Sequence, residues 1–290
     1  MRPRSALSLP LLMATFQIAL ADANVRVEPL KTGGAAVYRP GIDTPIFAFN
    51  APENGRPYVH PLLAPDGQGI LTEYSPSHHK HQTGIYVGFL KANGRDFFHN
   101  RGGDHFLRRD FIHKMTPEGV VLKSVYDLLG KDKKPLLLET QHWVFHDFTD
   151  NYAIDLTLTL QAQVDVTFDR HDYGGLFVRM PWTNQPDARA ANSEGAINAK
   201  AEGQKARWVD LGMTVVGRKR PAHIAILSRD ETPWRVDGQL GVGPAPSRVG
   251  AWKLAAGHSR VFRYRFLVYT GIFQPDRVEA EWKALRANNN

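Results

Sequence analysis

The stretch Tyr-Ala-Ile-Asp-Leu-Thr-Leu-Thr-Leu, residues 152–160, carries a large apolar side chain at every second position. Side chains of a strand alternate between its two faces, so this period of two puts Tyr, Ile and the three Leu on one face. Residues 260–269 repeat the pattern, with Arg263 and Arg265 opposite the apolar positions. Both stretches predict half-buried strands of an antiparallel sheet.

Most of the remaining chain has the same character. Short strand-like runs are separated by clusters of Gly, Pro, Asn and Asp, which is typical of a β-sandwich or barrel. Because helices do not alternate with the strands, the pattern speaks against a parallel α/β sheet. The runs lie at 24–30, 34–38, 45–49, 69–74, 84–90, 106–113, 119–126, 136–146, 174–180, 206–216 and 222–228.

Two segments depart from the strand pattern. Residues 276–287 predict a helix, because Pro275 and Asp276 form a start signal. Residues 184–205 are polar and rich in Ala, Gly and Asn, and we expect a long loop over one end of the sheets. The chain therefore predicts an all-β fold, a large antiparallel β-sandwich with a C-terminal helix.

The N-terminus has the parts of a secretory signal peptide. Met-Arg-Pro-Arg is followed by an apolar run over residues 5–20 and by Ala19-Leu20-Ala21. The run is short for a membrane span and contains Pro10. We expect a signal peptide at 1–21, a single β-sandwich domain at 22–290, a periplasmic or secreted location and no stable membrane insertion.

Composition narrows the chemistry. The sequence has no cysteine, which excludes disulfides, thiolate nucleophiles and thiolate metal sites. A chain of this length buries a sizeable core without such cross-links. The formal charge of +7 is spread along the chain without a long Lys/Arg block, which speaks against a nucleic-acid partner. Serine-hydrolase, phosphate-loop, dinucleotide and His-Glu-x-x-His motifs are absent from the sequence.

The stretch Ser-Pro-Ser-His-His-Lys-His-Gln-Thr-Gly, residues 75–84, holds three of the twelve histidines. In an extended segment His79 and His81 point to one side, and His78 points to the other. Two imidazoles on one side can act as an acid/base pair, hold a substrate carboxylate or bind a transition metal. A surface loop with local hydrogen bonds gives the same pattern. A metal would need a third ligand, for which the candidates are Glu73, Asp96, His99 and His105.

Two further segments carry candidate side chains. In Arg-Pro-Tyr-Val-His-Pro, residues 56–61, Arg56, Tyr58 and His60 share one side of an extended segment. Arg can clamp a carboxylate, and Tyr and His can transfer protons. A polar edge strand is the alternative. In residues 138–143 one face carries an acid, an amide and an indole, from Glu139, Gln141 and Trp143. This face suits a stacked sugar, and the solvated face of a long strand is the alternative.

The run Gly-Gly-Leu-Phe-Val-Arg-Met-Pro-Trp, residues 174–182, embeds a charge in an apolar strand. Burying Arg179 is costly without an anion, so we expect either an anionic ligand or a structural carboxylate such as Asp210. Because Arg179 lies near its strand's end, we expect it to face the histidine loop across one cleft.

These segments together resemble a family of exported bacterial proteins labelled PmoA-like or methane oxygenase. The resemblance rests on 56–61, 76–84, 93–98, 174–179, 192–195, 206–210 and 264–271, and so spans nearly the whole mature chain. Many members carry His-Pro-His-His-Arg-Gly at the histidine loop, whereas this chain ends the loop with His-Gln-Thr-Gly. The resemblance implies a role in carbohydrate catabolism and a β-sandwich similar to the galactose-mutarotase supersandwich.

We therefore expect an exported carbohydrate-active enzyme that acts on a sugar or oligosaccharide by His/Arg acid–base chemistry, as a lyase, epimerase or hydrolase. A metal-dependent enzyme using His79 and His81, or a carbohydrate-binding protein without catalysis, remain alternatives. We expect no cofactor, with a divalent metal as the alternative. The expected catalytic residues are His79, His81, Arg179, Tyr58, His60 and Glu139. The expected substrate-binding residues are Arg56, His78, Trp143, Trp182 and Asp210.

Overall fold

The alternating stretch forms β9 (Tyr152–Ala162), a central strand of the sheet. In the computed structural model, which describes residues 25–148 and 150–287, both neighbours of β9 run antiparallel to it. Leu156 pairs with Trp143 on one side and with Tyr264 on the other, and all three side chains are buried. The period of two therefore points the large side chains of three adjacent strands into one core.

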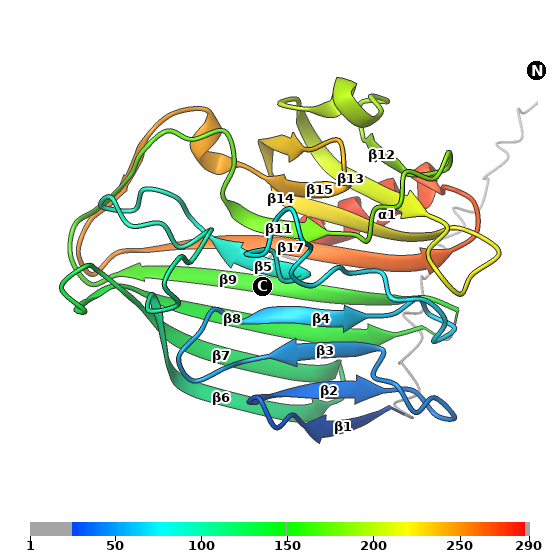
Figure 1. The fold of residues 1–290 in the computed structure, drawn as a ribbon, viewed down its shortest axis with the longest axis horizontal. Helices are drawn as coiled ribbons and strands as arrows, with labels where there is room; N and C mark the ends of the chain where they lie inside the picture. The colour runs from blue at the N-terminus through cyan, green and yellow to red at the C-terminus, as the bar shows by residue number, and fades with distance from the viewer. Residues whose placement is uncertain (1–24, 149, 288–290) are drawn as a thin grey trace, which may run out of the picture.

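The strands stack in two layers (Figure 1). The front layer contains β1 (Arg26–Pro29), β2 (Gly34–Tyr38), β3 (Phe47–Asn50), β4 (Tyr58–Leu62), β5 (Ile85–Gly88), β11 (Gly175–Arg179) and β15 (Gly241–Pro244). The back layer contains β6 (Phe106–Thr116), β7 (Gly119–Leu129), β8 (Pro135–Asp147), β9, β17 (Ser259–Thr270), β13 (Lys205–Met213) and β12 (Arg189–Asn192).

One long strand joins the layers. β14 (Ala222–Val236) pairs with β17 along its first half and with β13 as far as Pro233, whereas its last three residues pair with β15. Residue 234 onward thus belongs to the front layer, and the sheet folds over on itself through this strand. The end of β14 is thus separated from β11 only by β15, and the candidate site lies there.

The core fills the space between the layers. Phe47 and Phe49 of β3 lie 6.2 and 5.7 Å from the ring of Trp143, and Trp143 stacks on Phe266 of the back layer at 5.8 Å. Aromatic contacts of this kind contribute beyond the apolar area they bury. The predicted antiparallel β-sandwich is confirmed.

The one α-helix in the described part of the chain, α1 (Pro275–Ala287), begins within one residue of its predicted start. It covers the outer face of the back layer, where Val278, Trp282 and Leu285 pack on Trp208 and Leu267. Trp282 Nε1 donates to the carbonyl of Ser228 at 2.9 Å, which fixes the helix against β14. The predicted C-terminal helix is confirmed.

Short elements were less well predicted. Residues 69–74, expected as a strand, form only isolated bridges, and 184–205 contains β12 and a 3-10 turn, η1 (Asn198–Ala201), rather than loop alone. The pair β10 (Val166–Phe168) and β16 (Trp252–Leu254) and the turn η2 (Pro246–Arg248) were not anticipated. These pieces have three or four residues, too few to show a period.

The predicted signal peptide, residues 1–21, lies outside the described residues. Within the part of the chain that is described, no helix is long and apolar enough to cross a membrane.

Candidate functional site

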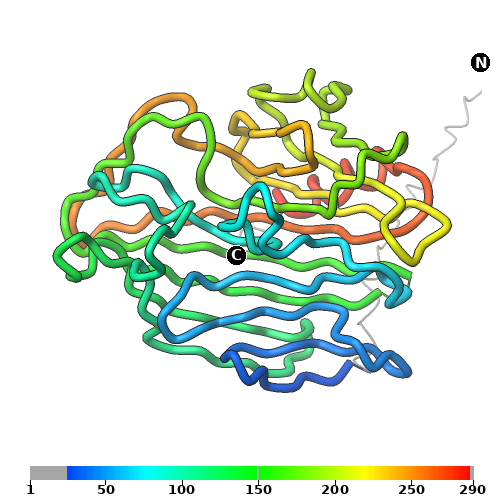
Figure 2. Tube along the Cα trace, in the orientation of Figure 1, coloured from blue at the N-terminus to red at the C-terminus, as the bar shows by residue number. Residues whose placement is uncertain are grey.

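The histidine loop is a pair of turns, not the extended segment expected. The amide of His79 donates to the carbonyl of Pro76 and that of Gln82 to the carbonyl of His79, both at 2.9 Å. In Figure 2 the loop, drawn in cyan, projects beside β5 and β11. Its end requires glycine, because Gly84 has φ +74° and a Cβ there would lie 2.2 Å from the carbonyl oxygen of Val59.

His79 and His81 nevertheless line one cavity, of about 120 Å³. Its lining combines aromatic and polar side chains, which come from the loop, from β11 and from the end of β14, among other segments. The other lining residues are Gln82, Phe98, His99, Tyr173, Phe177, Arg235 and Asp237. We call this cavity the histidine pocket.

His81 and His99 lie closest together, with ring centroids 4.5 Å apart, and His79 lies 5.8 Å from His81. Burial lowers the pKa of His81 to about 4, helped by the neighbouring charges of His99 and Arg56. Burial, followed by the charge of Arg179, also lowers the pKa of His79. His81 is therefore a neutral imidazole at neutral pH, able to accept a proton rather than to hold an anion.

His99 differs from His81 because a carboxylate holds it. Its Nδ1 lies 2.7 Å from Asp96 Oδ2, and Asp96 Oδ1 accepts the amides of Phe98 and His99. Burial raises the pKa of Asp96, but the hydrogen bonds from His99 outweigh that effect and the net pKa is lowered. A proton on Nδ1 thus faces the ionised carboxylate of Asp96. The other ring nitrogen, Nε2, lies 3.5 Å from the hydroxyl oxygen of Tyr173.

Arg179 lies beneath the pocket and is 0% exposed. It donates from Nε to Gln82 Oε1 at 2.5 Å, from Nη2 to Asp237 Oδ2 at 2.6 Å and from Nη1 to the carbonyl of Gln239 at 2.5 Å. The carboxylate that pairs with it is Asp237, so the suggestion of Asp210 was wrong. Gly241 leaves room for the pair, because a Cβ there would lie 2.5 Å from Arg179 Nη2. The guanidinium supports the pocket and does not line it.

Arg56 is likewise buried, which corrects its expected contact with substrate. Its guanidinium lies 3.7 Å from the ring centroid of Tyr86 and donates to the carbonyls of Phe98 and His81 and, at 3.2 Å, to Thr83 Oγ1. Burial lowers the pKa of Arg56 to about 10. Arg56 therefore ties the histidine loop to the segment that carries His99.

Glu139 and Trp143 share a face as predicted, but that face is the core. They are 1% and 0% exposed, and Gln141 joins them by donating to Glu139 Oε1 at 2.8 Å and accepting from Trp143 Nε1 at 3.1 Å. Burial raises the pKa of Glu139 to about 7. Neither side chain can contact a ligand from solvent, so the stacking role expected of Trp143 and the catalytic role expected of Glu139 do not fit this structure.

Tyr58 and His60 lie next to the pocket but do not line it. Both rings contact Tyr74, at 5.3 and 5.5 Å, and His60 Nδ1 lies 3.0 Å from Thr72 Oγ1. Burial, followed by the neighbouring Tyr74, raises the pKa of Tyr58 to about 12, and burial lowers the pKa of His60. His60 instead borders a second, largely apolar cavity together with Glu73.

Asp210 belongs to another part of the molecule. Its carboxylate is 1% exposed and lies 2.7 Å from His223 Nδ1 and 2.7 Å from the hydroxyl of Tyr269. His223 lies near the start of β14 and Arg235 near its end, about 40 Å further along the strand, and neither Asp210 nor His223 lines the histidine pocket. Asp210 therefore cannot share a ligand with the histidine pocket.

Trp182, His78 and His105 also stand apart from the pocket lining. Trp182 packs on the main core, His78 is exposed with its ring 4.9 Å from that of His79, and His105 Nδ1 lies 3.0 Å from Asp104. In residues 25–148 and 150–287, no group of three or more His, Asp or Glu side chains is placed to hold a metal ion.

Sequence reasoning missed the four other titratable residues of the pocket lining. His99 was considered only as a third metal ligand, and Tyr173, Arg235 and Asp237 were not considered. The one local signal was Asp96-Phe-Phe-His99, because an acid three residues before a histidine can reach its ring in a turn. Arg235 and Asp237 meet the histidines only through the folding-over of the sheet at β14, and Tyr173 meets them because β11, which it precedes, pairs with β5.

Comparison with known proteins gives a family but no curated relative. The model of a family described as "Family of unknown function (DUF6807)" matches residues 42–283. No curated protein matches the chain.

Three solved structures share features of the fold. A protein from the human microbiome assigned as a kojibiose phosphorylase has a TM-score of 0.44 and 7% identity over 92% of this chain, which spans only 32% of that protein. An Escherichia coli K12 protein assigned as an aldose 1-epimerase has a TM-score of 0.38 and 12% identity, covering 77% of this chain and 95% of that one. The Slr1438 protein of Synechocystis sp. PCC 6803 has a TM-score of 0.38 and 11% identity, covering 88% and 99%. Similarities at this level do not bear on the chemistry of the pocket.

Proposed function

This chain belongs to DUF6807, a family of unknown function, and we propose that it is a carbohydrate-active enzyme that transfers protons in the histidine pocket. The observation that carries the proposal is the pair His81 and His99, whose rings lie 4.5 Å apart in different environments. Acid–base catalysis needs two groups in different surroundings, one that favours the protonated form and one that favours the unprotonated form.

The two imidazoles divide the roles. His81 has no carboxylate partner, and its lowered pKa keeps it unprotonated and ready to take a proton from a substrate. His99 presents Nε2 near Tyr173, with Asp96 holding the opposite ring nitrogen. His99 can deliver a proton from Nε2 to a substrate oxygen that gains charge when both ring nitrogens are protonated, a form that Asp96 stabilises at Nδ1, and the Tyr173 hydroxyl is a second donor. His79 completes the wall and shapes access to His81.

A sugar suits the lining. The pocket combines aromatic rings, Phe98, Phe177 and Tyr173, with polar groups at its rim. Its volume lies below the roughly 300–1,000 Å³ of most small-molecule sites, so we expect it to take one sugar unit or the end of a longer chain. The family resemblance to proteins of carbohydrate catabolism supports the same substrate class.

Proton transfer beside a carbonyl, as in an epimerase or a lyase, fits better than glycoside hydrolysis. Hydrolysis commonly uses two carboxyl groups about 5–10 Å apart. Among the described residues that line the pocket, Asp237 is the one carboxylate, and it is bound to Arg179, while Glu139 is enclosed in the core. The histidine pair is thus the better supported source of acid and base.

The test is a panel of neutral, acidic and oxidised sugars and oligosaccharides, incubated with the protein in D₂O and read by mass spectrometry. Incorporation of deuterium without other change indicates epimerisation, loss of water indicates elimination, and gain of water indicates hydrolysis. We expect incorporation of deuterium or loss of water. A panel that shows only gain of water would contradict proton transfer as the reaction.

We also propose that the protein is exported, with a mature chain that begins near Asp22. The intact mass of secreted protein tests this.

A metal-dependent reaction at His79 and His81 remains the alternative mechanism. Metal analysis of protein purified without an affinity tag or chelator tests it.

A further inference from the structure

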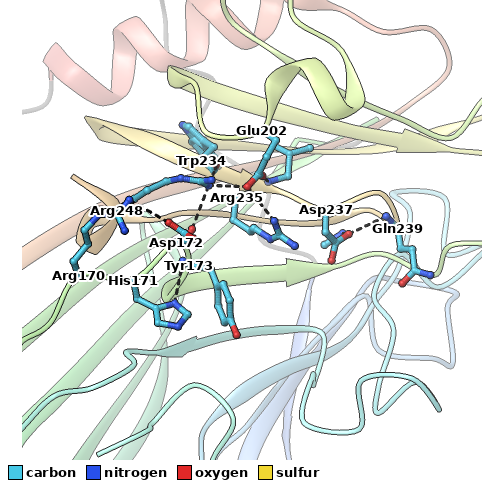
Figure 3. Close-up of polar contacts among 12 residues, drawn as sticks. Arg170, His171, Asp172, Tyr173, Glu202, Trp234, Arg235, Asp237, Gln239 and Arg248 are labelled. Atoms are coloured by element: carbon cyan, nitrogen blue, oxygen red, sulfur yellow. Dashed lines mark hydrogen bonds and ion pairs between the residues drawn. The ribbon is translucent and has the colours of Figure 1, made fainter. Parts of the chain in front are cut away.

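Two arginines share one carboxylate at the rim of the histidine pocket. Glu202 Oε1 accepts from Arg235 Nη1 at 3.0 Å and from Arg248 Nη1 at 2.7 Å, and Oε2 accepts the amide of Val236 at 2.5 Å. Figure 3 shows Arg235 and Arg248 converging on Glu202. Because one negative charge faces two positive charges, the cluster keeps a net positive charge.

The surplus charge lies at Arg235. Arg248 also donates to the carbonyls of Asp172 and Trp234, at 3.2 and 3.3 Å, so it is held within the protein. Arg235, by contrast, lines the histidine pocket, and its side chain is 36% exposed. Across residues 25–148 and 150–287, the only hydrogen bond of its side chain is the one from Nη1, which leaves Nε and Nη2 for a ligand.

The other charged groups around Arg235 are already compensated. Asp237 is paired with Arg179, and Asp96 is bound to His99. Asp172 lies 3.5 Å from Arg170, on the exposed side. Tyr173 contributes a ring 6.0 Å from the Arg235 guanidinium and no charge at neutral pH. No carboxylate that lines the pocket is left to neutralise Arg235.

We propose that Arg235 is a specificity-determining residue that binds the carboxylate of an acidic sugar, such as a uronic acid, at the rim of the histidine pocket. The proposal rests on the proposed function, because it places the rest of the sugar next to His81 and His99. Guanidinium and carboxylate match in geometry, and two free N–H groups allow a forked contact. A cation at the carboxylate also favours removal of a proton from the carbon that bears it.

Binding measured apart from turnover tests the proposal. Isothermal titration at constant ionic strength would compare D-glucuronate with D-glucose and D-galacturonate with D-galactose. We expect the wild-type protein to bind at least one uronate about tenfold more tightly than its neutral counterpart, as one charge-assisted contact would give. In R235Q this preference falls to within about twofold, while the affinity for the neutral sugar is unchanged.

Two control variants distinguish the loss of a specific contact at Arg235 from an effect of misfolding or of lost charge. R235K keeps the charge but not the fork, and we expect it to retain part of the preference. R170Q removes the same charge from an exposed neighbour that does not line the pocket, and we expect the full preference to remain.

The outcomes separate this proposal from the proposed function. A uronate preference that survives R235Q, an equal affinity for both sugars of each pair, or no measurable binding of either uronate would overturn the proposal. Deuterium exchange on neutral sugars could still be observed in all three cases. A preference lost in R235Q without any turnover would instead uphold the subsite and count against catalysis.

Discussion

Arg179 Nε donates a hydrogen bond of 2.5 Å to Gln82 Oε1, and this contact joins a fully buried guanidinium to the loop that carries the histidines. The same guanidinium binds Asp237, at the end of β14. Arg179 therefore connects two walls of the histidine pocket from below. Arg179 was expected to face the histidine loop across one cleft, but it is buried outside the pocket lining and is bonded directly to Gln82 of that loop.

Loss of this support should destabilise the fold. R179L leaves the carboxylate of Asp237 and the amide of Gln82 without their partner, and breaking a buried pair costs about 3–5 kcal/mol. Urea denaturation at pH 7 would measure the free energy of unfolding. The exposed control R170Q should change it by less than about 0.5 kcal/mol. An R179L variant as stable as R170Q would contradict the structural role.

The pH dependence of activity should reflect the environment of His81. The base is free above its pKa of about 4, so kcat/KM should stay high well below pH 6.5 and fall only as the pH approaches 4. The same depressed pKa makes stability fall between about pH 6.5 and 4, because the unfolded state binds the proton first. In H81Q this contribution is lost. An activity that halves near pH 6.5 would show that His81 is not the base.

Glu139 should affect stability and not catalysis. Its pKa is raised from 4.5 to about 7 by burial, so the folded state holds a proton that the unfolded state has released. Stability therefore falls as the pH rises through this range, and E139Q should stabilise the protein at pH 8 by about 3 kcal/mol and not at pH 4. Thermal unfolding at the two pH values measures this. An E139Q variant that is less stable at pH 8, or inactive, would contradict a buried, non-catalytic carboxyl.

Asp96 should act through His99. In D96N the amide cannot accept the Nδ1 proton as strongly, so the ring is free to take the other tautomer. We expect kcat to fall by at least about tenfold with KM changed by less than twofold. The imidazole nitrogen shifts of His99 in NMR spectra would report the tautomer directly. Unchanged chemical shifts together with an unchanged kcat would mean that Asp96 only accepts the backbone amides of its own turn and does not act on the His99 ring.

The sequence predicted the fold better than the site, and the residues show why. In β9 and β17 the period of two is unbroken, so both strands could be identified. In β8 the period was also correct, but Glu139 and Gln141 suggested a solvated face. Their burial is tolerated because Gln141 donates a hydrogen bond to Glu139 and accepts one from Trp143. The spacing of residues in the sequence does not reveal that these polar groups pair with one another. His79 and His81 could be found because three histidines cluster in sequence. Arg235 could not, because it reaches the histidines only where β14 crosses between layers.

Solvent-deuterium exchange in the histidine variants tests the central claim most directly. Exchange of a substrate C–H would be followed by NMR in D₂O for wild type, H81Q and H99Q, with H113Q, an exposed histidine on β6, as the matched control. If His81 and His99 are the acid–base pair, the rate falls by about 10²-fold or more in H81Q and H99Q, stays at the wild-type value in H113Q, and sugar affinity is retained in all three. Exchange at the wild-type rate in H81Q and H99Q would contradict catalysis by this pair.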